Sequence, residues 1–128
     1  YQVLRGKNKN FNTIFKIDNT IDGGDICLQN FFKLDGVELY DELRKKQAKS
    51  IVDLMLSFLK AYPKVNFKKQ KGKENFNKRR KPEDGQINIH KSLKSQFNLL
   101  RISDNDRFPA FFIYKRTKFI INLKKQDE

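Results

Sequence analysis

Three aspartates stand close together in one short stretch of this sequence, and they are its best candidates for chemistry. Asp18, Asp22 and Asp25 share one short segment, and Gly23-Gly24 separates the last two. Carboxylates this close are costly unless some of them have a dedicated partner. Two adjacent glycines allow positive φ and let another backbone or a flat ligand approach closely. The aspartates could equally hydrogen-bond their own turn, so the residue types alone leave a plain hairpin turn and a binding loop both open.

The segments on either side of these aspartates must position them. The stretch from Thr13 to Ile17 is rich in β-branched and aromatic residues, and Ile26-Cys27-Leu28 is a short apolar run. Both patterns are typical of strands, and the paired glycines break the chain between them. The sequence therefore predicts a strand, a tight turn and a second strand.

The same stretch resembles a known signature. Thr-Ile-Phe-Lys-Ile-Asp, followed by Ile-Asp-Gly-Gly-Asp-Ile-x-x-Gln, is similar to the aspartate loop of the formyltetrahydrofolate-dependent formyltransferases. That family includes methionyl-tRNA, glycinamide ribonucleotide and amino-sugar N-formyltransferases. The resemblance implies that Asp22 is catalytic and acts with an Asn and a His from an earlier segment. It further implies that 10-formyltetrahydrofolate is the formyl donor and that its pterin is held by Ile17, Asp18, Asn19, Ile21 and Asp22.

A second motif lies after a strongly basic run. Residues 78–88, Lys-Arg-Arg-Lys-Pro-Glu-Asp-Gly-Gln-Ile-Asn, resemble the Arg-Arg-x-Pro-Glu-Asp-Gly-x-Ile motif of sugar-nucleotide N-formyltransferases. The tRNA enzymes usually carry a different, Lys-containing version. Arg79 and Arg80 could bind a substrate phosphate or pair with Glu83 and Asp84, since a guanidinium matches both partners. Pro82 stiffens the chain ahead of a predicted turn.

Composition bounds the remaining possibilities. A chain of 128 residues is one domain's worth, and its net charge of +13 suggests nucleic acid, an anionic membrane surface or a phosphorylated substrate as partner. No apolar run approaches the ~20 residues that cross a bilayer. The single Cys27 fits a reducing cytoplasm, and the single His90 argues against a His-rich metal site, so no metal is expected. The chain starts at Tyr1 without Met, so we expect a fragment that lacks an amino-terminal half.

Helix signals follow the aspartate loop. Asp35 and Glu38 fit a capping box, and Pro63 should end the helix near Ala61. Helical spacing puts one set of residues on a buried face: Tyr40, Leu43, Ile51, Leu54, Met55 and Phe58. The run from Lys64 to Lys73 fits a mobile, solvated connector better than a phosphate-contacting loop.

The last third of the chain predicts a second helix and a hairpin. Ser92 can cap a helix whose buried stripe is Leu93, Phe97 and Leu100, and residues 111–123 have the pattern of two strands and a turn. We expect an α/β fold, the carboxy-terminal part of a Rossmann-like formyltransferase domain. Its parts would be residues 1–63 as the end of the catalytic domain, residues 64–81 as a basic linker, and residues 82–128 as a small helix-hairpin subdomain.

The leading hypothesis is a cytoplasmic N-formyltransferase acting on the primary amine of a nucleotide-linked amino sugar, in polysaccharide biosynthesis. This chain alone should be inactive, because the Asn and the His belong to the missing half. A methionyl-tRNA formyltransferase, which would bind tRNA, is the alternative favoured by the positive charge. A small basic nucleic-acid-binding module is a further alternative, but it leaves the aspartate loop unexplained. The oligomeric state stays open, a homodimer included.

Overall fold

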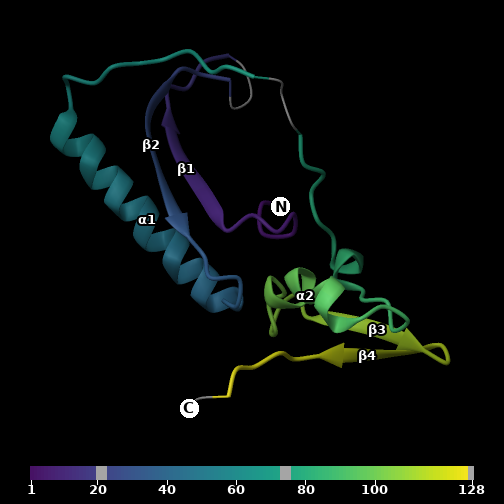
Figure 1. Ribbon diagram of the computed structural model, residues 1–128. Helices are drawn as coiled ribbons and strands as arrows, with labels where there is room; N and C mark the ends of the chain where they lie inside the picture. The colour runs from purple at the N-terminus through teal and green to yellow at the C-terminus, as the bar shows by residue number, and fades with distance from the viewer. Residues whose placement is uncertain (20–22, 73–75, 127–128) are drawn as a thin grey trace. The chain divides into compact units, whose positions relative to one another are not determined.

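The computed structural model describes residues 1–19, 23–72 and 76–126, which form two compact units. The first comprises Tyr1–Asn8, Leu34–Arg44 and Asn77–Glu128, and the second comprises Lys9–Lys33 and Lys45–Phe76. Each unit holds one two-stranded antiparallel sheet (Figure 1). In chain order the elements are β1 (Lys9–Phe15), β2 (Ile26–Lys33), α1 (Tyr40–Ala61), the 3-10 helix η1 (Pro82–Gly85), α2 (Leu93–Arg101), β3 (Ala110–Tyr114) and β4 (Thr117–Ile121).

The predicted strand–turn–strand unit is present as β1 and β2. Their register pairs Thr13 with Gln29 and Ile14 with Leu28, and a bulge follows at Phe15. The first strand begins at Lys9, four residues before the predicted start, although Lys and Asn in this stretch have a low preference for strands. Pairing with β2 overrides that local preference, because each added residue satisfies further backbone groups.

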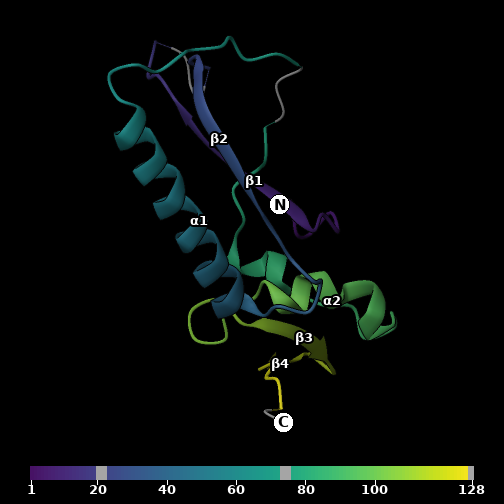
Figure 2. The same cartoon turned by 60° about the vertical axis from the view of Figure 1, so that its left-hand side comes forward.

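Helix α1 lies beside this sheet in both views of the ribbon (Figures 1 and 2). Its contact with the strands is partly polar, since the Asn12 side chain donates to Ser50 Oγ at 2.9 Å and the Asn30 side chain donates to the Ser50 carbonyl at 2.6 Å. Leu54, one turn further, is buried. The helix ends at Ala61, as predicted from Pro63.

The start of α1 corrects the predicted capping box. Glu38 does accept hydrogen bonds from the Asp35 and Gly36 backbone N–H groups, at 2.8 and 3.1 Å, but these residues are not helical. The helix begins at Tyr40, where the Leu39 N–H donates to Glu42 at 2.8 Å. The predicted acid pair therefore closes a turn ahead of the helix, and Glu42 binds the backbone at its true start.

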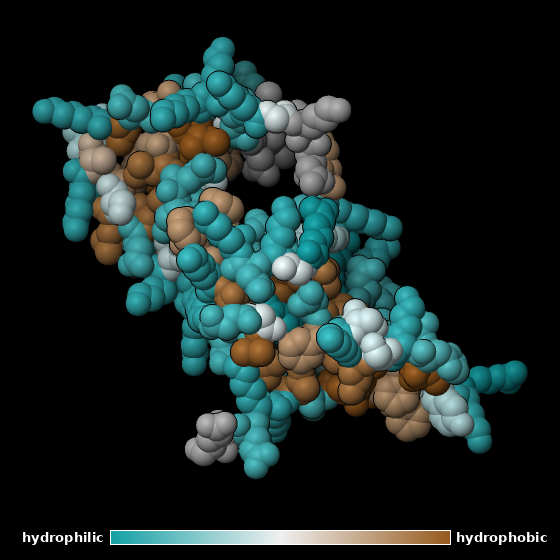
Figure 3. All heavy atoms as spheres, viewed as in Figure 1, coloured by the Kyte–Doolittle hydropathy of each residue, from teal (hydrophilic) through white to brown (hydrophobic). Residues whose placement is uncertain are grey.

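Only part of the predicted apolar face of α1 is covered. Leu54 is buried, but Ile51 and Met55 are exposed, and Leu59 continues their stripe at i+4 spacing. These side chains follow a stripe next to the one that contains Ser50 and Leu54. Figure 3 shows apolar atoms gathered over this helix. The helix therefore carries a wider apolar sector than the two strands of its unit cover.

The other unit has its own small core, formed by Ile87, Leu100 and Ala110. The Ile87 N–H donates to the Phe111 carbonyl at 2.7 Å, which attaches the segment after η1 to strand β3. Strands β3 and β4 form the predicted hairpin with a two-residue turn, Lys115 and Arg116, both at positive φ. Such a turn matches the twist of the strands.

Helix α2 begins as predicted. Ser92 is its N-cap, and the Ser95 N–H donates to Ser92 Oγ at 3.3 Å. Leu100 is buried, but the predicted burial of Leu93 is wrong, because this side chain is 66% exposed. Leu93 is the first residue of the helix and lies away from the core cluster. No helix in the described parts of the chain is both long and apolar enough to cross a membrane.

Candidate functional site

The aspartate loop leaves the β1–β2 ladder in a defined way. Beyond the bulge, the Lys16 N–H donates to the Asp25 carbonyl at 2.9 Å, so the loop is closed by one further backbone hydrogen bond. Gly24 is buried just inside this closure. A β-carbon at Gly24 would overlap the Lys16 carbonyl, so only glycine fits there. Gly24, the second of the paired glycines, thus allows two backbone segments to approach closely at this position.

Three of the five predicted folate-binding residues lie on the described part of this loop. Ile17 is 87% exposed, and Asp18 and Asn19 are exposed as well. Ile21 and the predicted catalytic Asp22 lie outside the described residues. The structure therefore brings Ile17, Asp18 and Asn19 together on one loop. An exposed isoleucine beside polar side chains is suited to contact a flat, partly apolar ring.

The basic run after α1 is not a free connector along its whole length, which corrects that expectation. Lys68 forms an isolated antiparallel bridge with Ile26, with backbone hydrogen bonds of 2.7 Å (Ile26 N–H to Lys68 carbonyl) and 2.8 Å (Lys68 N–H to Ile26 carbonyl). The Gln70 side chain donates to the Gly24 carbonyl at 2.8 Å. The segment is therefore attached to the chain that leaves the aspartate loop, because β2 offers it unpaired backbone groups.

The motif of residues 79–85 is folded around η1. The Lys81 N–H donates to Asp84 Oδ2 at 2.7 Å, and Arg80 Nη2 donates to the Asp84 carbonyl at 2.9 Å. The predicted turn is present, but Arg80 meets a backbone carbonyl rather than an acid side chain. Arg79 is exposed, and its guanidinium has no partner among the described residues. Arg80 and Lys81 help line a cavity of about 260 Å³ that also includes Tyr40 and Phe108.

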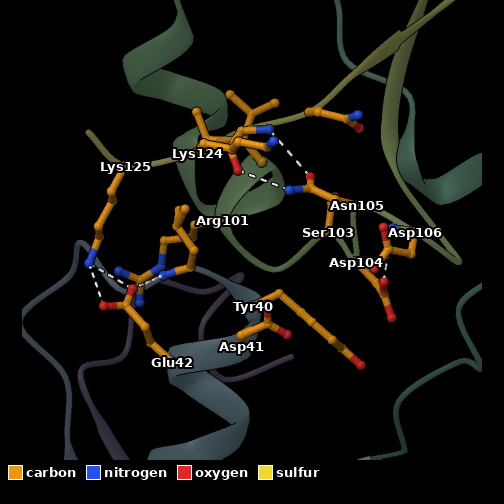
Figure 4. A pocket seen from close by; sticks show the side chains of 14 residues that line it. Tyr40, Asp41, Glu42, Arg101, Ser103, Asp104, Asn105, Asp106, Lys124 and Lys125 are labelled. Carbon is orange, nitrogen blue, oxygen red and sulfur yellow. Dashed lines mark hydrogen bonds and ion pairs between the residues drawn. The ribbon is translucent and has the colours of Figure 1, made fainter. Parts of the chain in front are cut away.

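A larger cavity, of about 570 Å³, lies in the same unit and was not predicted. Its lining comes from three separate segments, residues 39–42, residues 100–106 except Ile102, and residues 122–125. Figure 4 shows Lys125 and Glu42 pointing toward each other across it, with Nζ 2.6 Å from Oε2. The hydrogen bond from Lys125, together with that from the Leu39 N–H, holds the pKa of Glu42 below its usual value.

A second acid that lines this cavity, Asp104, is also paired with a cation. Asp104 accepts hydrogen bonds from the Arg107 and Asp106 N–H groups and from Arg107 Nε. The Arg107 backbone N–H is the main cause that lowers the pKa of Asp104, and the Asp104 carboxylate in turn raises the pKa of Arg107. Groups already paired in this way stabilise the fold more readily than they perform chemistry.

Arg101 differs, because its charge is buried and the described residues leave two of its three guanidinium nitrogens without a hydrogen bond. Its side chain is 1% exposed, and Nη1 lies 3.7 Å from Glu38 Oε2, a carboxylate that is also buried. Within the described chain, Arg101 Nε and Nη1 have no hydrogen-bond partner. Sequence patterns gave no signal for this pair, although both residues are part of recognisable segments. Among the described residues, no cluster of three or more His, Cys, Asp or Glu could hold a metal.

The sequence matches no protein-family model and no curated protein. Solved structures match closely in shape. Methionyl-tRNA formyltransferase from Clostridium thermocellum has a TM-score of 0.79 and 24% identity over 98% of this chain and 55% of its own. A 4-N formyltransferase from Francisella tularensis has a TM-score of 0.73 and 22% identity over 91% of this chain and 51% of its own. HypX from Aquifex aeolicus has a TM-score of 0.69 and 15% identity over 91% of this chain and 21% of its own.

These likenesses define the class of fold. The chain has a mixed helix and strand architecture with the fold of the formyltransferase family. It spans about half the length of the first two structures, 55% and 51%. At this identity the likeness concerns the fold alone, and the reaction has to be argued from the chain's own residues.

Proposed function

We propose that this chain is the carboxy-terminal part of an N-formyltransferase that transfers the formyl group of 10-formyltetrahydrofolate to the primary amine of a nucleotide-linked amino sugar. One observation carries this proposal. The chain has the formyltransferase fold, and Gly24 packs against Lys16 where the sequence resembles the aspartate loop of that family. A loop that tolerates only glycine at that point is built to present its neighbours in one conformation.

The proposed reaction is an attack of the amine on the formyl carbon. A tetrahedral oxyanion forms, the amine gives up one proton and N10 of the folate takes one up. The bond between the formyl carbon and N10 then breaks to leave tetrahydrofolate and the formamide. The oxyanion requires preorganised donors. As the resemblance implies, an Asn and a His from an earlier segment supply them. Asp22 orients that His and holds a water for proton transfer.

The amino-sugar nucleotide is favoured as acceptor by the motif of residues 79–85. Its turn is held by hydrogen bonds to Asp84, and it leaves the Arg79 guanidinium exposed, with no described partner, for a phosphate. The cavity lined by Arg80, Lys81 and two aromatic residues has room for a small ring, at about 260 Å³. We assign Arg79 and Arg80 to substrate binding on this basis.

A second acceptor class, methionyl-tRNA, is favoured by the net charge of +13 and by the likeness to the methionyl-tRNA formyltransferase structure. A simple nucleic-acid-binding role explains the charge but requires no aspartate loop. A salt titration of nucleic-acid binding tests this role. Affinity that depends on contacts with phosphates falls steeply as the salt concentration rises.

The deciding experiment measures formyl transfer from 10-formyltetrahydrofolate by the full-length protein. The acceptors are a panel of amino-sugar nucleotides and methionyl-tRNA. Turnover on an amino-sugar nucleotide at about 1–10³ per second supports the proposal. Turnover on the tRNA alone would establish the alternative. We expect residues 1–128 by themselves to be inactive, since they contain neither the Asn nor the His. Turnover by this chain alone would contradict that expectation.

A further inference from the structure

We infer that residues 67–71, here called the basic strap, bind the anionic glutamate tail of the folate donor. This inference rests on the proposed function, because it assigns a role to a segment beside the proposed folate loop. It concerns specificity for the donor and adds a site to the predicted folate-binding residues. Three features of the strap support it: its hydrogen bonds to the chain beside the aspartate loop, its exposed lysines and the exposed ring of Phe67.

The strap is held in place by hydrogen bonds at two positions. Lys68 exchanges two backbone hydrogen bonds with Ile26, at 2.7 and 2.8 Å, and the Gln70 amide donates to the Gly24 carbonyl at 2.8 Å. Gly24 and Ile26 lie on the chain that leaves the aspartate loop. A segment bonded to both of them lies beside this end of the aspartate loop.

The strap concentrates positive charge that no carboxylate of the described residues neutralises. Lys68, Lys69 and Lys71 are exposed, and their ammonium groups have no carboxylate partner among the described residues. Holding several cations in one short, attached segment is unfavourable without an anion nearby. The arrangement therefore fits a ligand with several negative charges along a flexible chain.

A folate tail has this chemistry. Each glutamate linked to the p-aminobenzoyl ring adds a carboxylate, and lysine ammonium groups bind such charges as flexible point charges. Phe67, 47% exposed at the start of the strap, offers a ring face to the neighbouring p-aminobenzoyl group. The phosphates of the acceptor share the anionic chemistry, so the test must separate the two sources.

The test compares folates with short and long tails. In the full-length protein, equilibrium binding of 5-formyltetrahydrofolate is measured for its monoglutamate and its pentaglutamate. Each exposed ion pair strengthens binding by up to about fivefold. We expect Lys68→Gln/Lys69→Gln/Lys71→Gln to weaken pentaglutamate binding about tenfold, and monoglutamate binding by less than about twofold. High salt should remove the wild-type preference for the longer tail.

Two variants control the result. The triple change of the same lysines to arginine keeps the charge and should keep the preference. The triple change Lys45→Gln/Lys60→Gln/Lys94→Gln removes the same charge from exposed helical positions and should have no effect. Gln70→Ala should reduce the preference without changing any charge, because the strap loses its bond to Gly24.

The outcomes that overturn the inference differ from those that overturn the proposed function. Folate binding with equal affinity for both tails would overturn the strap's role alone. A raised Michaelis constant for the acceptor, with tail preference unchanged, would assign the lysines to acceptor phosphates. Loss of RNA affinity in the glutamine variant, again with tail preference unchanged, would make the strap a nucleic-acid contact. Absence of any folate binding by the wild-type protein would overturn both.

Discussion

Gly24 lies directly against the backbone carbonyl of Lys16, with no space between them for a β-carbon. This contact occurs where the aspartate loop closes, next to the hydrogen bond between the Lys16 N–H and the Asp25 carbonyl. The closure of the loop is therefore held by backbone atoms of Lys16, Gly24 and Asp25.

Gly24→Ala should lower the free energy of unfolding by about 3 kcal/mol, because a methyl group cannot be placed without moving the Lys16 carbonyl. Gly72→Ala is the matched control. Gly72 has open space around its α-carbon but a φ of +118°, so the cost should be about 1–2 kcal/mol of backbone strain. Urea unfolding of the two variants measures the difference, and equal losses would show that the close approach is relaxed in solution.

Asp22→Asn should reduce the turnover of the full-length enzyme by up to about 10⁴-fold, the loss seen when an orienting carboxylate is removed from a catalytic network. Asp18→Asn and Asp25→Asn should cost far less, because the proposed reaction gives them no proton to orient. Steady-state kinetics of the three variants test this. Equal, mild losses for all three would mean that the loop has a structural role only.

Arg79→Gln/Arg80→Gln should raise the Michaelis constant for the amino-sugar nucleotide by about tenfold or more, because each arginine is assigned to an anionic group of the substrate. Lys68→Gln/Lys69→Gln/Lys71→Gln should leave that constant within about twofold, since these lysines are assigned to the donor. Kinetics at saturating donor separate the two sets. A larger effect of the lysines than of the arginines would reverse the assignment.

Arg101→Met should destabilise the protein by about 3–5 kcal/mol, because it leaves the buried carboxylate of Glu38 without its counter-charge. The double variant Glu38→Leu/Arg101→Met should recover most of that loss, since it removes both buried charges together. A double-mutant cycle in chemical unfolding gives the coupling. Additive losses would show that the two charges do not interact across their 3.7 Å separation.

Asp104→Asn should destabilise the protein at neutral pH and much less in acid. The pKa of Asp104 is lower in the folded protein, first because of the Arg107 backbone N–H. Its contribution is therefore complete above the usual aspartate pKa of about 4 and is lost as pH falls through the lower folded value. Unfolding of wild type and variant between about pH 7 and pH 2.5 checks this, with Asp53→Asn as the exposed control. A pH-independent difference would contradict it.

The sequence predicts those parts of the fold whose signals are local. Alternating β-branched residues and the paired glycines indicate the β1–β2 unit, Pro63 marks the end of α1, and Ser92 marks the start of α2. Each of these depends on neighbours within a few positions. The predicted chemistry of Asp22 stays a prediction, since that residue lies outside the described chain.

Contacts between distant segments could not be predicted in the same way. Gln70 and Gly24 are 46 positions apart, and nothing in either local pattern indicates their hydrogen bond. The strap therefore looked like a solvated connector. The start of α1 was misplaced for a different reason, because Glu38 binds the backbone of a turn that precedes the helix, and Glu42 binds the backbone at the helix start.

The polar contact of Ser50 with Asn12 and Asn30 has a consequence for how α1 is seated. Apolar side chains on a helix tolerate sliding by a turn, because one methyl group replaces another at little cost. A hydroxyl and two amides have no such freedom, since any shift leaves buried donors and acceptors unmatched. These three side chains therefore fix the position of the helix against the strands. The contact matters more because it allows one position of the helix than because it is strong. The segment that follows the helix therefore begins at a fixed place.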